Sequence, residues 1–179
     1  MANVIPVAQP KLVKQDGNMN TQRPKFDEAA SQVWLPSTLV TLTSGALVRV
    51  ATAGVLLYGL SPDGSHAATD KPPVAFNAQT HWPFNLNDNA ILEISITTGG
   101  TVGSTATGAV PSAMTLGASY GLYTETAGGA NLAPIGQQML NISDTTNTLF
   151  TYVGLPDTTL ATDINARVLV TPIKSKLQA

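Results

Sequence analysis

The 179-residue chain contains no cysteine and few charged residues. The absence of cysteine excludes a disulfide framework, a thiolate metal site and a thiol nucleophile. Asp, Glu, Lys and Arg together make up 11% of the residues, which is less than half of the usual fraction of about a quarter. So low a charged fraction argues against a disordered tail, a coiled coil and a helical protein stabilised by surface ion pairs. No segment approaches the roughly 18 consecutive apolar residues of a membrane-spanning helix, so we expect no membrane partner.

The charges that are present are distributed unevenly along the chain. Residues 1–30 carry a formal charge of +1, residues 31–165 of −6 and residues 166–179 of +3, which together give the net charge of −2. Basic ends on an acidic body indicate ends that lie on an acidic partner or a neighbouring subunit, or ends that are merely solvated. A nucleic-acid-binding protein needs a far more basic face, so we expect no nucleic-acid partner. The first 30 residues lack the apolar segment of a signal peptide, so we expect a chain that is made and used without export.

Residues 1–30 are predicted to form an extended N-terminal arm. They contain three prolines and neither a helical nor an alternating pattern of apolar residues. At roughly 3.3 Å per residue, such an arm could span about 100 Å and so reach beyond its own domain. The alternative is ordinary terminal disorder. Apolar residues such as Val4, Ile5 and Phe26 favour the arm, because a simple linker would lack them.

Residues 31–176 are typical of a body built from short β-strands, and residues 177–179 form a tail. β-rich runs alternate with breaks that contain glycine or proline, such as Ser44-Gly45, and this is the spacing of hairpins. Strands are expected at 38–43, 46–52, 55–60, 90–98, 115–124, 138–142, 148–155 and 167–173. Apart from a helical turn suggested at 27–33, no amphipathic helix is indicated. We therefore predict an all-β protein, with a jelly-roll, β-barrel or sandwich body of about eight short strands.

A long irregular loop is predicted at residues 65–88. It contains several prolines and the aromatic residues Phe76, Trp82 and Phe84. Loops of this length inside a compact domain are uncommon and are often functional. The loop is therefore a second candidate, after the arm, for contacts with a partner.

One sequence pattern could indicate an enzyme. The run GASYG at 117–121 matches G-x-S-x-G, in which a strand-to-helix elbow exposes a nucleophilic serine. That motif requires a helix after the serine and a histidine later in the chain. His66 and His81 are the only histidines, and both precede Ser119. A strand interrupted by glycine explains the run better, so we expect no catalytic residues and no enzyme.

No metal site or cofactor is expected either. The two histidines lack the spacing of a zinc site, and the loop aspartates Asp63, Asp70 and Asp88 do not form the D-x-D-x-D-G loop that binds calcium. No phosphate-binding or dinucleotide-binding fingerprint occurs. Five aromatic residues could form a platform on which sugars stack, although burial is the more common role for most of them: Trp82, Phe84, Tyr120, Tyr123 and Tyr152.

Several runs between residues 35 and 176 carry a pattern that is shared with one family. They are GALVRVATAGVLLYGLSPDGS, KPPVAF, THWPFNL, YGLY, QQMLNISDT and TDINARVLVTPIKS. In these runs the sequence resembles the head decoration proteins of tailed bacteriophages, also called cement proteins. The resemblance implies a jelly-roll or barrel body that forms trimers on the outer surface of the icosahedral head, at or near three-fold and quasi-three-fold positions. It also implies a structural role without a reaction, in which arms and loops clamp neighbouring major capsid subunits against genome pressure.

The resemblance implies partners and contact residues as well. The partners would be the major capsid protein and the other chains of a homotrimer, and the chain, made in the host cytoplasm, would be found in the virion. The arm would contact the capsid through six residues: Val4, Ile5, Lys11, Lys14, Arg23 and Lys25. The loop would contact the capsid or a neighbouring protomer through three: His81, Trp82 and Phe84. Two alternatives stay open, namely a phage tail, baseplate or carbohydrate-binding β module, and an esterase that uses Ser119.

Overall fold

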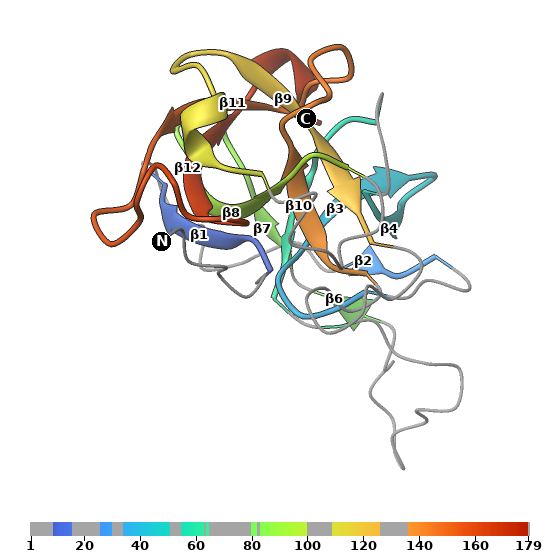
Figure 1. The fold of residues 1–179 in the computed structure, drawn as a ribbon. Coiled ribbons are helices and arrows are strands. Elements are labelled where there is room, and N and C mark those ends of the chain that lie inside the picture. Colours follow the sequence, from blue (N-terminus) through green and yellow to red (C-terminus); the bar gives the residue numbers. More distant parts are fainter. Residues whose placement is uncertain are drawn as a thin grey trace.

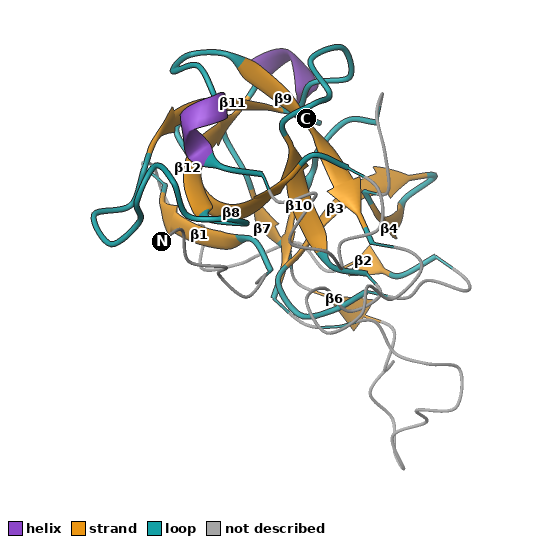
Figure 2. Cartoon of the chain, viewed as in Figure 1, coloured by secondary structure: helices purple, strands orange, loops and turns teal. Residues whose placement is uncertain are grey.

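The computed structural model describes residues 9–15, 26–29, 34–50, 55–62, 64, 80–81, 83–99, 109–125 and 136–178. Within these ranges the chain forms twelve strands and two short 3-10 helices (Figure 1). The strands are β1 (Lys11–Lys14), β2 (Phe26–Asp27), β3 (Thr38–Thr43), β4 (Ala46–Arg49), β5 (Gly59–Ser61), β6 (Thr80–His81), β7 (Phe84–Asn85), β8 (Ile91–Thr97), β9 (Ser119–Thr124), β10 (Gln138–Asn141), β11 (Phe150–Gly154) and β12 (Arg167–Pro172). The helices are η2 (Pro111–Ala113) and η3 (Lys174–Lys176). The body is all-β, as predicted (Figure 2).

Five of the strands close into a barrel. Their order is β8-β10-β9-β11-β12, and the pairing of β12 with β8 completes the ring. All neighbours in the ring are antiparallel except β8 and β10, which are parallel. Parallel strands need a long connection, and here the chain passes through η2 and β9 between the two strands. The barrel is therefore complete only after β9, β10, β11 and β12 have all paired with their neighbours.

A second, smaller sheet lies beside the barrel. Its strand order is β4-β3-β5-β7, and all its pairs are antiparallel. The turn between β3 and β4 is formed by Ser44 and Gly45, whose φ angles of 51° and 80° are both positive. Two-residue hairpin turns of type I′ require this geometry, so the predicted hairpin is confirmed. The pair β2–β6 borders this sheet, because Glu28 forms a bridge with Leu47 of β4.

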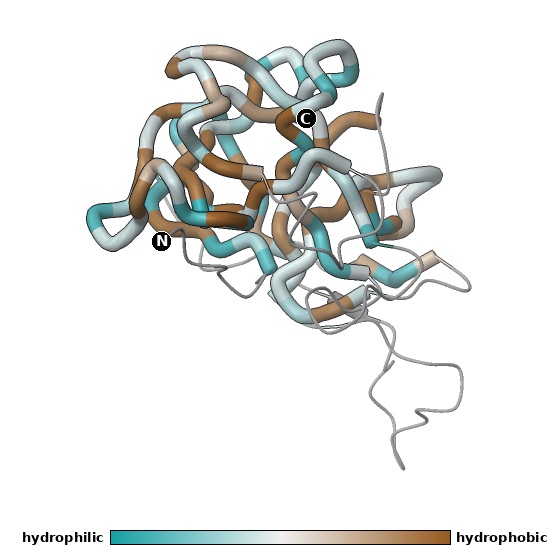
Figure 3. Tube along the Cα trace, in the orientation of Figure 1, coloured by the Kyte–Doolittle hydropathy of each residue, from teal (hydrophilic) through white to brown (hydrophobic). Residues whose placement is uncertain are grey.

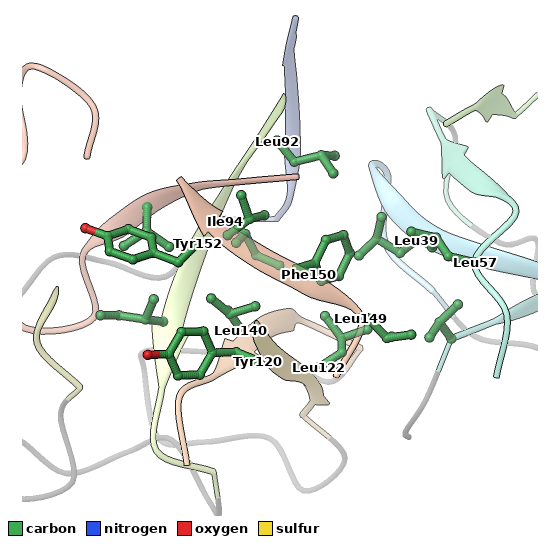
Figure 4. Close-up of a cluster of buried hydrophobic side chains, with 14 of the residues drawn as sticks. Leu39, Leu57, Leu92, Ile94, Tyr120, Leu122, Leu140, Leu149, Phe150 and Tyr152 are labelled. Atoms are coloured by element: carbon green, nitrogen blue, oxygen red, sulfur yellow. The ribbon is translucent and has the colours of Figure 1, made fainter. Parts of the chain in front are cut away.

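One hydrophobic core extends from the barrel interior into the second sheet. Ile94, Leu140 and Phe150 point into the barrel and are fully buried. The Phe150 side chain lies between the other barrel side chains on one side and Leu39 and Leu57 on the other (Figure 4). Full burial of such a side chain contributes about 1.5–3 kcal/mol. The hydrophobic stretches of the chain mostly follow the strands (Figure 3), and side chains fill the barrel interior, as is typical of small barrels.

Two glutamine side chains join β3 to the rest of the molecule. The Gln138 amide of β10 is completely buried; it accepts a hydrogen bond from the Leu39 N–H at 2.6 Å and donates to the carbonyls of Leu39 and Val50 at 3.1 and 2.8 Å. The Gln178 amide accepts from the Leu42 N–H at 2.8 Å and donates to the Leu42 carbonyl at 2.9 Å. Each amide thus pairs with the backbone of β3 as a neighbouring strand would.

The sequence predicted strands at or near eight of the twelve positions and missed four short ones. β3 has the predicted bounds, and β8, β10, β11 and β12 lie within their predicted ranges. The expected total of about eight strands was too low. β1, β2, β6 and β7 are two to four residues long, and they lie in the segments 1–30 and 65–88, where no alternating pattern indicates a strand. The run 115–124 becomes a strand only from Ser119, and Asp27 belongs to β2 instead of a helical turn.

Candidate interaction surface

Residues 9–15 of the predicted arm lie on the barrel, whereas residues 26–29 lie beside the second sheet. β1 pairs antiparallel with the first half of β8, and β10 pairs with the second half. β12 covers the same part of β8 as β1 does, so it must occupy the opposite edge. β1 and β10 therefore share one edge of β8, and β1 extends the barrel wall at that edge (Figure 1).

The four residues of β1 expose three side chains to solvent. Leu12 lies opposite Leu92 and packs against the core. A bulge between Leu12 and Lys14 inserts Val13 into the strand. Bulges change the direction in which neighbouring side chains point, and as a result Lys11, Val13 and Lys14 are all exposed. Val13 is 50% exposed, which is unusual for a valine in a strand.

Glutamine side chains fix the residues on both sides of β1. The Gln9 amide donates to the Gly136 carbonyl at 3.4 Å and accepts from the Gln138 N–H at 3.3 Å. The Gln15 amide donates to the Asn85 carbonyl, in β7, at 3.0 Å. The segment 9–15 is therefore attached to the barrel at one end and to the second sheet at the other.

An ion pair connects β12, β8 and the start of this segment. The Arg167 Nε lies 3.0 Å from the Glu93 Oε1. The same guanidinium donates to the carbonyls of Gln9 and Glu93, both at 3.2 Å. Both side chains are about one fifth exposed, and hydrogen bonds of a charged donor are stronger than neutral ones. Arg167 therefore stabilises the position of the arm segment on the barrel.

The predicted contact residues fall into three groups. Lys11 and Lys14 lie together on the outside of β1. His81 belongs to β6 and lies opposite Phe26, while Phe84 of β7 is half-buried and packs against the core. The remaining predicted contacts lie outside the described residues: Val4, Ile5, Arg23, Lys25 and Trp82.

The serine of the GASYG run occupies a structural position. Ser119 is the first residue of β9, its Oγ lies 3.2 Å from the Thr151 Oγ1, and a strand follows it instead of a helix. Gly121 is required by close packing: its N–H donates to the Asp144 carbonyl at 2.8 Å, and an added Cβ would lie 2.5 Å from the Asp144 Oδ2. The glycines and the serine therefore have a structural explanation. Among the described residues, no group of three or more His, Cys, Asp or Glu side chains is arranged to hold a metal ion.

Two of the tyrosines proposed as a sugar platform are core residues. Tyr120 and Tyr152 lie inside the barrel, and their rings are buried (Figure 4). The Tyr120 hydroxyl accepts a hydrogen bond from the Thr115 N–H at 2.9 Å. Burial raises the pKa of Tyr152, and the neighbouring Tyr120 raises this pKa further. These ring faces are covered by the protein and are not open to a sugar.

Three further exposed apolar side chains lie on and near the barrel. Their exposed fractions are 69% for Leu116, 61% for Leu160 and 41% for Val153. The segment of Leu116 is joined to β11 by the Gly117 N–H, which donates to the Tyr152 carbonyl at 2.9 Å. The loop of Leu160 is joined to η2 by a bond of 2.9 Å from the Ser112 N–H to the Ala161 carbonyl. Sequence reasoning missed these residues, because it placed Leu116 in a strand at 115–124 that begins only at Ser119, and because Leu160 lies in a threonine-rich turn without a pattern of its own.

Comparison with known proteins gives no family assignment. A scan against family models found no match, and searches of curated proteins and of solved structures found none either. In the described ranges, no helix is long and apolar enough to cross a membrane.

Proposed function

We propose that this chain is a structural protein of a tailed-bacteriophage head, which binds the outer surface of the capsid as a trimer and stabilises the expanded shell. The resemblance of its sequence to head decoration proteins motivates the proposal. One observation carries it: apolar side chains fill the barrel interior, whereas exposed apolar and basic side chains lie outside, on β1 and around the Leu116 segment. A surface that contacts other proteins combines exposed apolar side chains with charged ones.

Binding alone would be sufficient for this function. A site formed by several capsid subunits exists only in the assembled, expanded shell. A protein that binds this site therefore favours the expanded shell over every state that lacks the site. Three protomers that bind together multiply the effect through avidity. Major capsid subunits would be clamped in this way at or near three-fold and quasi-three-fold positions.

The alternative functions have less support. A carbohydrate-binding module would need exposed aromatic rings, but three of the five candidates belong to the core or pack against it: Tyr120 and Tyr152 are buried, and Phe84 packs against the core. An esterase would need a general base within hydrogen-bond reach of its serine, but the Ser119 hydroxyl is paired with that of Thr151, which is not a base.

Density-gradient sedimentation of lysate from the native source tests the proposal. We expect the chain to sediment with DNA-filled particles and to be released by mild denaturation. Electron microscopy of the labelled particles would then distinguish a head position from a tail or baseplate position. If the chain stays at the top of the gradient, the capsid function is refuted.

The trimer can be tested separately on the purified protein. Three chains of 18.6 kDa have a combined mass of about 56 kDa. We expect light scattering to give this mass for the protein released from shells. We expect the same mass for the purified free protein at high concentration. A monomeric mass under both conditions would contradict the trimer and leave capsid binding untouched.

A further inference from the structure

We propose that the outer face of β1, β8 and β12 is the surface that binds the capsid, and that it recognises an acidic protein surface. This inference rests on the proposed function and assigns the contact to one side of the barrel. The face is defined by ten residues: Lys11, Val13, Lys14, Asp88, Ile91, Glu93, Arg167, Leu169, Thr171 and Lys174.

The strand register places these side chains on one side. Residues directly opposite each other in paired strands point to the same face of a sheet. Lys11 lies opposite Glu93, and Glu93 lies opposite Leu169 of β12. Lys14 lies opposite Ile91 at the next outward position of β8. Because alternate residues of β8 and β12, such as the buried Leu92 and Val170, point into the core, this set points outward.

Two residues outside the strands extend the same face. The Thr171 hydroxyl donates to the Asp88 carbonyl at 2.9 Å, which holds the segment before β8 against β12. The Lys174 Nζ lies 3.4 Å from the Asp88 Oδ2, and the lysine side chain is 85% exposed. The face therefore continues from Arg167 at one end of β12 to Lys174 beyond the other end.

The face is basic on a molecule that is acidic elsewhere. It holds four of the nine Lys and Arg residues and two of the eleven Asp and Glu residues. Its formal charge is thus +2, and the rest of the chain, with a total of −2, carries −4. Complementary charge favours an acidic partner and disfavours contact with the acidic remainder of a second copy.

Apolar side chains lie among the charged ones on this face, which favours a protein over a nucleic acid. Val13 is half exposed, and Ile91 and Leu169 are partly exposed beside the lysines. Protein–protein interfaces combine apolar and charged side chains in this way. The carboxylates of Glu93 and Asp88 would repel phosphates, and the face has no aromatic side chain on which a base could stack.

The strand that carries the lysines is held in place before any partner binds. The bonds from Gln9, Gln15 and Arg167 fix the ends of the segment 9–15. Binding to a surface that is already ordered avoids the entropic cost of ordering a flexible arm. The lysines on β1 can therefore contribute to binding without the cost of ordering their backbone.

The test compares two double variants on capsid shells. The shells come from the particles with which the chain sediments, after mild denaturant has removed this protein. Lys11→Gln with Lys14→Gln removes two positive charges from the face. Thr145→Glu with Asn147→Glu adds two negative charges to the exposed turn after β10, near Thr97 at the far end of β8. Both variants have a net charge of −4, so they differ in where the charge changes and not in its amount.

We expect the lysine variant to bind the shells about tenfold more weakly than the wild type, and the control variant to change affinity by about twofold at most. The affinity of the wild type should fall as the salt concentration is raised, and the affinity of the lysine variant should fall less steeply. Equal melting temperatures would show that both variants are folded. A short duplex DNA serves as a second probe, and we expect it not to bind.

Each other outcome overturns a defined part of the inference. Unchanged binding of the lysine variant refutes the proposed face and leaves the capsid function intact. Equal weakening by both variants assigns the effect to net charge and also refutes the face. Tight binding of DNA that depends on Lys11 and Lys14 refutes an acidic protein as the partner. Failure of the wild type to sediment with particles or to bind shells refutes the proposed function together with this inference.

Discussion

Replacement of Gln138 by leucine should destabilise the protein, mainly because one buried backbone N–H loses its acceptor. The Gln138 amide lies just beyond the end of β4, between the backbones of Leu39 and Val50. It forms hydrogen bonds where the next residue pair of the β3–β4 ladder would otherwise do so. Without it, the Leu39 carbonyl still accepts from the Val50 N–H at 3.0 Å, and the Val50 carbonyl still accepts from the Thr124 hydroxyl at 3.1 Å. The Leu39 N–H would lose its 2.6 Å acceptor in a buried position.

The expected cost follows from these partners. A buried donor without an acceptor costs about 1–3 kcal/mol. The variant also loses the two bonds that the Gln138 amide donates to the Leu39 and Val50 carbonyls. Each of these losses costs roughly 0.5 kcal/mol, because the carbonyl keeps another donor. The total is about 2–4 kcal/mol, out of the 5–15 kcal/mol that is typical for a whole domain. For a chain of this size the melting temperature should fall by roughly 5–15 °C.

Urea denaturation followed by the fluorescence of the buried Trp34 would measure this loss. Gln138→Glu is the informative companion, because its carboxylate can accept from Leu39 but cannot donate to the two carbonyls, and we expect it to be at least as unstable. Thr145→Leu, at an exposed position, controls for the added apolar surface. A Gln138→Leu protein within about 0.5 kcal/mol of the wild type would refute the reasoning, because surface substitutions alone reach that value.

Three further predictions concern other parts of the structure. Gly59→Ala should lower the free energy of unfolding by more than about 2 kcal/mol, because the added Cβ would overlap the Phe84 carbonyl oxygen and lie 3.0 Å from the carbonyl carbon. Faster amide exchange in β5 and β7 should show that the two strands have separated. Unchanged protection of their amides would contradict this prediction. Arg167→Gln should speed amide exchange in residues 11–14 by mass spectrometry while the barrel strands stay protected, since the guanidinium holds Gln9; equal exchange in both proteins would show that Arg167 does not hold the arm. Tyr152 has a raised pKa in the folded state, so its contribution to stability should be complete below the unfolded value of about 10 and be lost as pH rises through the folded value; Tyr152→Phe should therefore flatten the alkaline decline in stability, and an identical decline would rule out this tyrosine as its cause.

The fold was predictable where sequence pattern and local geometry agree. The run 38–43 and the Ser44-Gly45 turn define a hairpin through β-branched residues and a residue pair that tolerates positive φ. The run 90–98 alternates in the same way and forms β8. Closure of the barrel was not predictable, because the parallel pairing of β8 with β10 depends on contacts between distant segments. The bond of Gln138 to Leu39, 99 residues away, has no local signal at all.

The candidate surface was predictable only in part. The basic residues of the N-terminal arm are visible in the sequence, and Lys11 and Lys14 were expected to make contacts as part of that arm. Their position was not visible, since β1 has four residues and a bulge that no pattern indicates. Ile91 and Leu169 join the lysines only through the register of β8 with its neighbours. Surfaces of this kind are assembled by tertiary structure, so sequence can supply their charges but not their outline.

The long reach of the hydrogen bonds has a consequence for folding on the ribosome. Arg167 binds Gln9 across 158 residues, and Gln178 binds Leu42 across 136. The barrel ring is incomplete until β12 has left the exit tunnel, so the earlier strands have unpaired edges until then. Domains dominated by such distant pairings fold in milliseconds to seconds, and their unpaired strand edges are prone to aggregate during that interval. Slower translation of the last forty or so codons should therefore lower the soluble yield, whereas a chaperone that shields exposed strands should restore it.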